Sequence, residues 1–479
     1  MKPTPSPWLT LGEVLRATGG RVLAAAPAGT AFTGAGIDSR RLAGGELFVP
    51  LSGTRSDGHD FVADALRGAA GGSLVAASRA VEGSWTAAGK PVIAVPDPLG
   101  ALTALGRHCR ERSGIPLVAV TGSNGKTTTK EMIAAVLGLS RRVLKNEGNL
   151  NNHIGVPLTL CRLRPEHEAA VLELAMSARG EIRALADICR PNVGVLTLAA
   201  AAHLATLKTV DEVALAKSEL AEALPADGLL VVNADDPRLW ALNRRRPLAV
   251  RSYALENREA DLRPAAVSMT ARGGSRFTLE DGTEVGLDLL GRHNVRNALA
   301  AVLVGDHFGV ARAEAARALR ALSPARHRLE LLRSGGISIL DDTYNANPAS
   351  MREALLLLGG IGTDGARRAV LGDMLELGPD AERLHEETGR LVPAAAWLYV
   401  AGEFRDALAR GARTAGVADA RIRRFDSTAA MAAAVRADAR PGDLVLVKAS
   451  RGMRLEQVVE ALAPGAHSEP EPLPAAERS

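Results

Sequence analysis

Residues 121–128 read Thr-Gly-Ser-Asn-Gly-Lys-Thr-Thr and combine glycines, a lysine and adjacent hydroxyls at a spacing typical of phosphate binding. Gly122 and Gly125 allow the backbone to turn its N–H groups toward an anion, and the start of a following helix favours negative charge. Lys126 adds a positive charge, and the Thr127 hydroxyl is a suitable Mg²⁺ ligand. We therefore predict that this phosphate loop binds a nucleotide through Gly122, Ser123, Asn124, Gly125, Lys126, Thr127 and Thr128.

The elements around the phosphate loop follow from the flanking pattern. Residues 117–120 form a short apolar run suited to a buried strand, and residues 130–139 favour a helix whose start includes the threonines. The general phosphate-loop pattern carries a glycine at the position of Val120, so the match is to a shorter variant. The alternative is a tight strand-to-helix turn that binds nothing, but the lysine and threonines favour the phosphate site.

The chain as a whole divides into units of mixed strands and helices. Its 479 residues suggest about three domains. In the middle of the chain, the apolar runs "AAVLELAM", "NVGVLTLAA" and "GLLVVNADD" alternate with helical patterns, which predicts a doubly wound sheet with ligands at the carboxyl ends of its strands. We expect domains at 1–97, 98–324 and 325–464, followed by a polar, proline-rich tail at 465–479 that is disordered.

The composition narrows the class of protein. Aromatic residues make up only 3% and the formal net charge is +4 without a basic block, so a nucleic-acid partner is not expected. The start of the chain has no apolar signal segment, and no apolar run is long enough to cross a bilayer, so we expect no membrane insertion. The three cysteines, Cys109, Cys161 and Cys189, form no CxxC pair, which fits a reducing cytoplasm.

Three further residues could serve a metal ion near the phosphate loop. Glu173 ends an apolar strand, where a carboxylate can hold a magnesium ion that bridges phosphates. His203 follows the next strand, and Lys217 lies in a helical pattern further along the chain. Taken alone, Glu173 is more often a solvated strand end, His203 a structural residue, and Lys217 a solvated or phosphate-pairing lysine.

The order of these motifs resembles the Mur ligases, which build the cell-wall peptide of bacteria. The resemblance rests on "TGSNGKTTT", Glu173, "AAHL" with His203, "ALAKSEL" with Lys217, "GRHNVRNALAA", "RHRLE" and "DDTYNANPASM", and it covers the chain apart from its tail. It implies a three-domain α/β fold in which a central doubly wound phosphate-loop ATPase-like sheet is flanked by a small N-terminal α/β domain and a C-terminal Rossmann-like domain. It also implies ATP and Mg²⁺, with Thr127, Glu173, His203 and a carbamylated Lys217 as metal ligands and Lys126, His203 and Lys217 as catalytic residues. An unmodified Lys217 is the alternative.

The resemblance also assigns residues to the rest of the nucleotide. Asn294 and Asn297 match the positions that meet the adenine, although Asn294 alone would favour a helix N-cap. Arg328 resembles the arginine that reaches the phosphates from the third domain, and Asp342 resembles the carboxylate that binds the ribose. Candidate residues near the substrate in the third domain are Tyr344, Asn345 and Asn347.

Within the family, the stretch "NEGNLNNHIGVPLTL" with Asn151 and Asn152 resembles the members that add D-alanyl-D-alanine to UDP-N-acetylmuramoyl-tripeptide. The N-terminal stretch resembles the module that holds the uridine diphosphate, with Ser39, Arg40 and His59 as candidates, and "VLGDMLELG" points to the same members. The segments "ELAMSARGEI" and "AAAAH" depart from the usual family forms. These departures affect the expected substrate contacts and packing more than the metal ligands.

The implied reaction activates a carboxylate as an acyl phosphate, which the amine of D-alanyl-D-alanine then attacks. We expect the C-terminal domain to close on the nucleotide and the enzyme to be a cytoplasmic monomer. One alternative is a sister ligase that adds the third amino acid of the peptide. A nucleotide-binding switch without ligase activity is the other.

Overall fold

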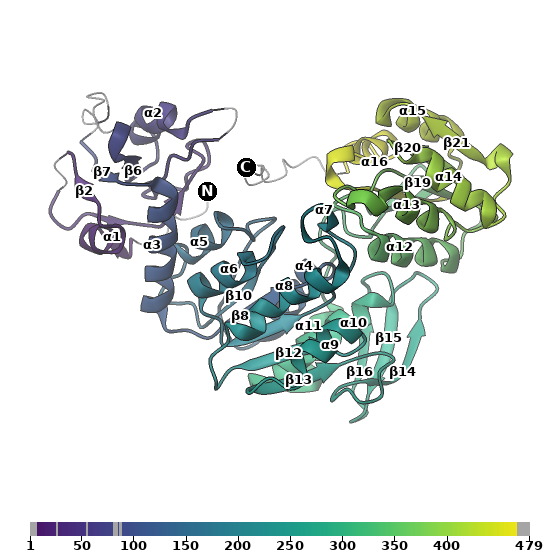
Figure 1. Ribbon diagram of the computed structural model, residues 1–479, viewed down its shortest axis with the longest axis horizontal. Coiled ribbons are helices and arrows are strands. Elements are labelled where there is room, and N and C mark those ends of the chain that lie inside the picture. The colour runs from purple at the N-terminus through teal and green to yellow at the C-terminus, as the bar shows by residue number, and fades with distance from the viewer. Residues whose placement is uncertain (1–6, 25–26, 54–55, 80–84, 86–88, 467–479) are drawn as a thin grey trace.

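The computed structural model describes residues 7–24, 27–53, 56–79, 85 and 89–466, and its chain forms three domains (Figure 1). The N-terminal domain lies at one end, the central domain in the middle and the C-terminal domain at the other end. The three-domain α/β fold implied by the resemblance is therefore confirmed. Residues 467–479 of the predicted tail lie outside the described residues.

The N-terminal domain is built on a small sheet with strand order β2-β7-β6-β5-β4, parallel except for β2. A two-stranded antiparallel ribbon of β1 and β3 lies beside it. Its strands are β1 (Leu9–Thr10), β2 (Arg21–Val22), β3 (Ala31–Phe32), β4 (Ala35–Gly36), β5 (Leu47–Phe48), β6 (Gly72–Ala76) and β7 (Val92–Val95). Its helices are α1 (Leu11–Thr18), η1 (Gly58–Phe61), α2 (Val62–Arg67) and η2 (Ala77–Arg79).

The central domain contains a six-stranded, fully parallel sheet with order β13-β12-β11-β8-β10-β9. Its strands are β8 (Leu117–Thr121), β9 (Val143–Lys145), β10 (Ala169–Glu173), β11 (Val193–Leu196), β12 (Leu229–Asn233) and β13 (Ala249–Tyr253). Its helices are α3 (Pro98–Ser113), α4 (Lys126–Leu137), α5 (Gly155–Leu160), α6 (Glu181–Cys189), α7 (Leu204–Leu207), α8 (Val210–Glu222), α9 (Pro237–Asn243), α10 (His293–His307) and α11 (Arg312–Arg320).

Both faces of the central sheet are covered by helices, as its strand sequences require. Along β8, Leu117 belongs to the core formed with α6 and α8, whereas Val118 belongs to the core formed with α4 and α10. Successive side chains of a strand point to opposite faces, so a strand buried on both faces must be apolar throughout. The predicted doubly wound arrangement is confirmed.

A three-stranded antiparallel sheet extends from the central domain and was not predicted from the sequence. It consists of β14 (Pro264–Met269), β15 (Ser275–Leu279) and β16 (Glu284–Leu287). Its first turn contacts the C-terminal domain, because a Cβ added at Gly273 would lie 2.8 Å from Ile361 Cδ1. The turn therefore depends on glycine both for its φ of +85° and for this close approach.

The C-terminal domain has a second six-stranded sheet, with order β17-β18-β22-β19-β20-β21, in which only β17 is antiparallel. Its strands are β17 (Glu330–Ser334), β18 (Ile337–Asp342), β19 (Arg367–Leu371), β20 (Trp397–Ala401), β21 (Ile422–Phe425) and β22 (Leu444–Lys448). Its helices are α12 (Pro348–Gly360), η4 (Gly378–Asp380), α13 (Ala381–Gly389), α14 (Arg405–Thr414), η5 (Asp419–Arg421), α15 (Thr428–Asp438), η6 (Arg451–Met453) and α16 (Glu456–Leu462).

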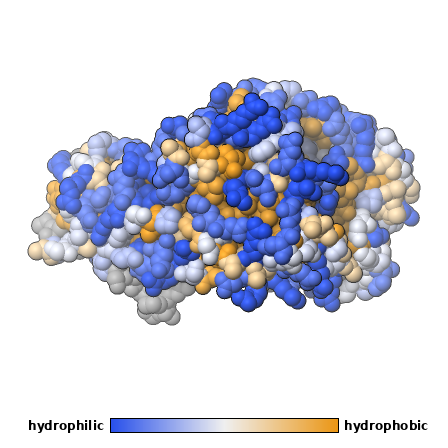
Figure 2. Space-filling view, turned by 90° about the horizontal axis from the view of Figure 1, so that it is seen from below, coloured by the Kyte–Doolittle hydropathy of each residue, from blue (hydrophilic) through white to orange (hydrophobic). Residues whose placement is uncertain are grey.

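On the face drawn in Figure 2, apolar residues gather near the middle of the molecule and are bordered by hydrophilic ones. Among the described residues, no helix has both the length and the apolar character that a membrane span requires.

Candidate nucleotide and metal site

The phosphate loop joins the carboxyl end of β8 to the start of α4, and its glycines are required by its geometry. Gly125 is the N-cap of α4 with a φ of +81°, and a Cβ there would lie 2.6 Å from Asn297 Oδ1. A Cβ at Gly122 would lie 1.8 Å from Thr197 Oγ1. Only glycine fits both positions, so the loop backbone approaches its neighbours closely and directs the first N–H groups of α4 toward the loop.

Lys126 folds back over the loop in this structure. Its Nζ donates to the carbonyl oxygens of Gly122 at 2.7 Å and Ser123 at 3.5 Å. Burial lowers the pKa of Lys126, while the charge of Glu173 acts in the opposite direction. The lysine is held by weak carbonyl partners, which a phosphate oxygen can replace.

Glu173 lies beside the loop because strand pairing brings it there. In the register of β10 and β8, Glu173 is opposite Val120, so both strands end at the same edge of the sheet. Thr127 Oγ1 donates to Glu173 Oε2 at 2.6 Å, and Asn151 Nδ2 donates to Oε1 at 2.8 Å. Glu173 is 2% exposed, so the alternative of a solvated strand end is wrong.

The charge on Glu173 is favoured despite its burial. Burial is the largest single effect and would raise the pKa of the carboxyl group, but the charge of Lys126 and several smaller effects together outweigh it, so the net pKa is lowered. Arg328, Lys130 and the hydrogen bond from Thr127 act in the same direction. The lowered pKa favours the ionised carboxylate of Glu173 beside the phosphate loop.

The oxygen atoms of Thr127 and Glu173, at the carboxyl edge of the central sheet, fit a magnesium site in which other ligands come from water and substrate. Among the residues that the structure describes, no group of three or more His, Cys, Asp or Glu side chains could hold a metal ion. Mg²⁺ usually combines one or two protein oxygens with water and substrate phosphates. The Thr127 hydroxyl and the Glu173 carboxylate supply two such oxygens, so the residues present fit the ion.

Lys217 is buried on α8, with 2% of its surface exposed, so a solvated lysine is ruled out. Burial lowers its pKa well below the ordinary value, and the nearby charge of Lys126 lowers it further. Its side chain has no hydrogen bond or ion pair with another described residue. A neutral buried amine without a partner is the form that can add carbon dioxide.

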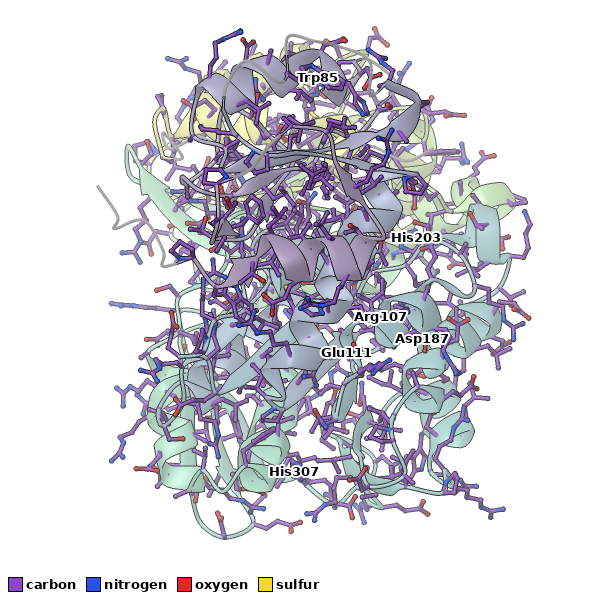
Figure 3. All side chains as sticks on the ribbon, turned by 90° about the vertical axis from the view of Figure 1, so that its left-hand side faces the viewer. Trp85, Arg107, Glu111, Asp187, His203 and His307 are labelled. Atoms are coloured by element: carbon purple, nitrogen blue, oxygen red, sulfur yellow. The ribbon has the colours of Figure 1, made fainter. Side chains whose placement is uncertain are left out.

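His203 is the N-cap of α7 and is labelled in Figure 3. Its Nδ1 lies 2.6 Å from Oε2 of Glu376, which belongs to the C-terminal domain. Its backbone is left-handed, with a φ of +57°. The structure thus gives His203 an interdomain partner that the sequence did not indicate.

The predicted adenine residues lie in the first turns of α10. Asn294 Nδ2 donates to the Leu290 carbonyl at 2.8 Å, and Asn297 Nδ2 donates to Asn294 Oδ1 at 2.9 Å. The N-cap of α10 is Arg292, so the alternative of a capping role for Asn294 is wrong. Both asparagines are buried, and the close approach of Asn297 Oδ1 to Gly125 places the pair against the phosphate loop.

Arg328 reaches the same region from the C-terminal domain. Its guanidinium lies over the ring of Tyr344, 3.9 Å from the ring centroid, and its charge acts on both Lys126 and Glu173. An arginine held by an aromatic face keeps its N–H groups available for a phosphate.

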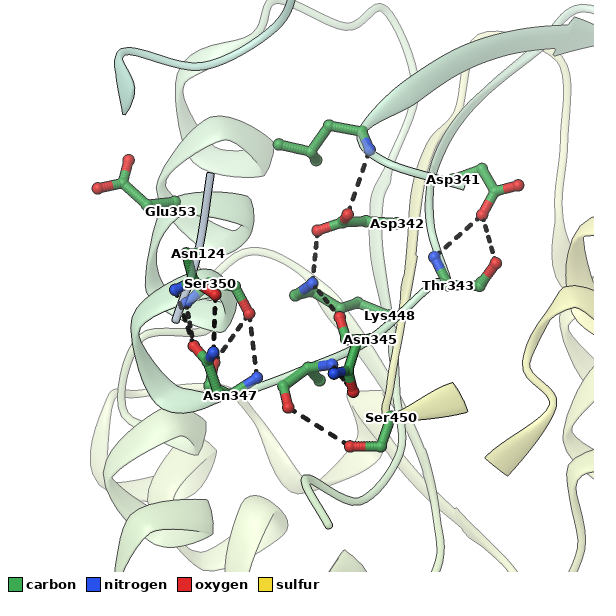
Figure 4. A network of polar contacts seen from close by, with 12 residues as sticks. Asn124, Asp341, Asp342, Thr343, Asn345, Asn347, Ser350, Glu353, Lys448 and Ser450 are labelled. Carbon is green, nitrogen blue, oxygen red and sulfur yellow. Dashed lines mark hydrogen bonds and ion pairs between the residues drawn. The ribbon is translucent and has the colours of Figure 1, made fainter. Parts of the chain in front are cut away.

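Asp342 and the predicted asparagines form a polar network at the end of β18 (Figure 4). Lys448 Nζ lies 2.6 Å from Asp342 Oδ2 and donates to the Asn345 carbonyl at 2.8 Å. Asn347 exchanges two hydrogen bonds with Asn124 of the phosphate loop, at 3.0 and 2.7 Å. The C-terminal domain is therefore docked directly on the phosphate loop.

Sequence reasoning missed two buried lysines. Lys130 Nζ donates to the Asn146 carbonyl at 2.6 Å, and Asn146 in turn donates from Nδ2 to the backbone carbonyl of Glu173 at 3.0 Å. Lys448 ends the apolar run "DLVLVK", and a lysine at the end of a buried strand was a signal that could have identified it.

Comparisons with known proteins agree with this architecture. Three family models match: "Mur ligase family, catalytic domain" at residues 31–110, "Mur ligase middle domain" at 120–305 and "Mur ligase, glutamate ligase domain" at 327–451. The UDP-N-acetylmuramoyl-tripeptide–D-alanyl-D-alanine ligase of Bacillus subtilis is 38% identical over 438 residues, covering 90% of this chain and 93% of the relative. The chain belongs to the Mur ligase family.

Solved Mur ligases share the fold along almost the whole chain. A crystal structure of MurF from Acinetobacter baumannii has a TM-score of 0.83 at 28% identity and covers 96% of this chain and 99% of its own. MurF from Thermotoga maritima in complex with ADP has a TM-score of 0.75 at 28% identity, covering 89% of this chain and 96% of its own.

The predicted substrate residues of this Mur ligase differ in exposure and in hydrogen bonding. Ser39 is half-buried and Arg40 is exposed, with Arg40 paired to Asp38 through two contacts of 2.9 Å. Asn152 Oδ1 accepts from the N–H groups of Ile154 and Gly155 at the start of α5. Asn345 is exposed, and Asn151 already contacts Glu173.

The structure places the ring of His59 inside the N-terminal domain. The ring is 4% exposed, its Nδ1 lies 2.7 Å from Asp57 Oδ1, and its Nε2 accepts from the Ala76 N–H at 3.0 Å. Both ring nitrogens are engaged inside the domain, so a ligand contact of this ring would require one of these partners to be displaced.

Proposed function

We propose that this chain is an ATP-dependent ligase that joins D-alanyl-D-alanine to UDP-N-acetylmuramoyl-tripeptide. The observation that carries the proposal is the full-length match to relatives of that name, 38% identical over 90% of the chain, together with an intact phosphate loop. The reaction class also fits the solved relative that holds ADP.

The protein's own residues would hold the triphosphate of ATP. Lys126 exchanges its carbonyl partners for phosphate oxygens, and Arg328 approaches from the C-terminal domain. Thr127 and Glu173 would hold Mg²⁺, which neutralises the charge that develops on the transferred phosphoryl group. His203 and a carbamylated Lys217 are the proposed ligands of a second ion, because a carbamate turns a cationic lysine into an anionic oxygen donor.

The remaining parts of ATP would lie along α10 and the end of β18. Asn294 and Asn297 offer amide donors and acceptors to the adenine, and Asp342 would accept from the ribose hydroxyls. Asp342 is already paired with Lys448, so the lysine fixes the carboxylate for this contact.

The chemistry needs no protein nucleophile. A carboxylate oxygen of the tripeptide attacks the γ-phosphorus, the bond to the β–γ bridging oxygen breaks, and ADP leaves an acyl phosphate behind. The amine of D-alanyl-D-alanine then attacks the acyl carbon, loses a proton and expels phosphate as the amide forms. The protein supplies orientation and electrostatic stabilisation, with Lys126 offsetting part of the developing charge.

The substrates would contact residues of all three domains. Ser39 and Arg40 are the candidates for the uridine diphosphate end, Asn151 and Asn152 for the peptide, and Tyr344, Asn345 and Asn347 for the region where the amine enters. We place the reaction in the cytoplasm, where ATP is available and the three free thiols stay reduced, and we expect the enzyme to act as a monomer.

A phosphate-release assay tests the proposal. The protein is mixed with ATP, Mg²⁺ and UDP-N-acetylmuramoyl-tripeptide, and D-alanyl-D-alanine is either supplied or withheld. We expect sustained phosphate release only when both substrates are present. A matched reaction uses the UDP-linked dipeptide with diaminopimelate or lysine, and turnover there but not with D-alanyl-D-alanine would assign the sister activity instead.

A further inference from the structure

The contact between His203 and Glu376 joins the central and C-terminal domains. Glu376 lies in the segment "VLGDMLELG", which begins with the last two residues of β19. Its Oε2 lies 2.6 Å from His203 Nδ1. A second contact fixes the same segment, because the Ala205 N–H donates to the Glu376 carbonyl at 3.1 Å.

Both partners hold backbone conformations that non-glycine residues rarely adopt. The φ of His203 is +57° and that of Glu376 is +65°. Such conformations cost on the order of 1 kcal/mol each and persist where the surrounding structure fixes them. Glycine follows at position 378, where an added Cβ would lie 3.4 Å from the Ala205 nitrogen. The segments around His203 and Glu376 therefore pack closely against each other.

The contact also determines which nitrogen of His203 is free. A carboxylate accepts hydrogen bonds, so the contact with Glu376 favours the tautomer of His203 in which Nδ1 carries the proton. Nε2 of the neutral ring then presents a lone pair, and it has no hydrogen bond with another described residue. A carboxylate that receives a histidine N–H in this way orients the ring and increases its basicity toward a metal ion.

We propose that Glu376 is a positioning residue that orients His203 as a metal ligand and makes this orientation depend on the docked C-terminal domain. The inference rests on the proposed metal role of His203. When the C-terminal domain moves away, Glu376 moves with it. His203 then loses the hydrogen bond that selects its tautomer and fixes the orientation of its ring. The metal site is therefore complete only in the domain arrangement that also brings Arg328 to the phosphate loop.

Manganese binding, followed by electron paramagnetic resonance in the presence of ADP, provides a readout that does not depend on turnover. We expect Glu376→Ala to weaken one class of bound Mn²⁺ by about 10- to 100-fold. Glu376→Gln, which retains the size of the side chain, should give a smaller loss. His203→Ala should affect the same class, and the double variant His203→Ala, Glu376→Ala should bind no more weakly than His203→Ala alone.

A matched control separates orientation of His203 from general loosening of the domain interface. Glu353 also crosses this interface, with 3.1 Å to Arg296 and 3.6 Å to His293. Glu353→Gln removes an interdomain carboxylate without touching His203, and we expect unchanged Mn²⁺ affinity.

Nitrogen-15 NMR of the histidine rings, assigned with His203→Ala, should show the Nδ1–H tautomer in the parent and a shift toward the other tautomer in Glu376→Gln.

The outcomes separate the inference from the proposed function. If the parent binds Mn²⁺ and both Glu376 variants bind it equally well with an unchanged His203 tautomer, the positioning role is overturned while the ligase proposal stands. An equal loss in Glu353→Gln would also overturn it, because the effect would then belong to the interface in general. If the parent with ADP binds no Mn²⁺, both proposals fail.

Discussion

The reciprocal amide pair of Asn124 and Asn347 should control how tightly the C-terminal domain docks on the phosphate loop. Its two hydrogen bonds measure 3.0 and 2.7 Å and join residues far apart in the chain. A typical intramolecular hydrogen bond contributes a net 0.5–1.5 kcal/mol, so the pair should contribute about 1–3 kcal/mol to docking. Its loss should shift the ratio of docked to undocked protein by about 5- to 150-fold.

The choice of substitutions follows from a second role of Asn347. Its Oδ1 also accepts from the Ser350 N–H at 2.9 Å and caps α12, so Asn347→Ala would destabilise the helix as well, by about 1 kcal/mol. Asn347→Ser retains a capping hydroxyl but is too short to reach the loop. Asn124→Ala removes the same interdomain bonds and leaves the cap intact.

Single-molecule energy transfer can measure the docked fraction. The three native cysteines are buried, so dyes can be attached through Glu280→Cys in the central domain and Ala420→Cys in the C-terminal domain, both at exposed positions. We expect Asn124→Ala and Asn347→Ser to reduce the docked fraction equally, and the double variant to match either one. Additive losses, or an unchanged distance distribution in both single variants, would refute the reasoning.

Three other predictions concern the phosphate loop and its metal ligands. Lys217→Ala should lose most ligase activity in an ADP-release assay and recover part of it with added short carboxylates; full activity in the plain variant would remove Lys217 from the site. The pKa of Glu173 is held below its ordinary value of 4.5, so its ionised form stabilises the fold above pH 4.5, and this contribution is lost as the pH falls through the lowered value. Denaturant unfolding of Glu173→Gln between pH 3 and 6 should therefore show a weaker acid dependence than the parent, and equal slopes would contradict the assignment. Gly125→Ala requires a left-handed alanine at a φ of +81°, a strain of about 1–2 kcal/mol that should weaken ADP binding about 5- to 30-fold in calorimetry, whereas Gly286→Ala, where a Cβ meets open space, should not.

The local part of the site could be predicted from the sequence because short-range patterns determine it. The loop residues follow one another along the chain, and Glu173 reaches them through the pairing of neighbouring parallel strands. A strand-end carboxylate alone would favour a solvated position, and it was the phosphate loop upstream that indicated this residue. The same reasoning correctly predicted the doubly wound sheet, since each strand had to be apolar on both faces.

The interdomain part could not be predicted in this way. Asn124 meets Asn347 across 223 positions, and His203 meets Glu376 across 173, so no local pattern indicates either pair. The sequence also did not indicate that both ring nitrogens of His59 have partners within its own domain. Polar residues reveal which chemistry is available, but the docking of domains determines which of them share a site.

The most direct test of the proposed mechanism follows the carboxylate oxygens of the substrate into the products. The third residue of UDP-N-acetylmuramoyl-tripeptide is labelled with oxygen-18 in both oxygens of the carboxylate that becomes the amide, and the released phosphate is analysed by mass spectrometry. If ATP held near Lys126 activates this carboxylate as an acyl phosphate, each phosphate should carry one oxygen-18 and each product amide should retain the other. Phosphate without the label, formed at the same rate as the amide, would contradict the central claim.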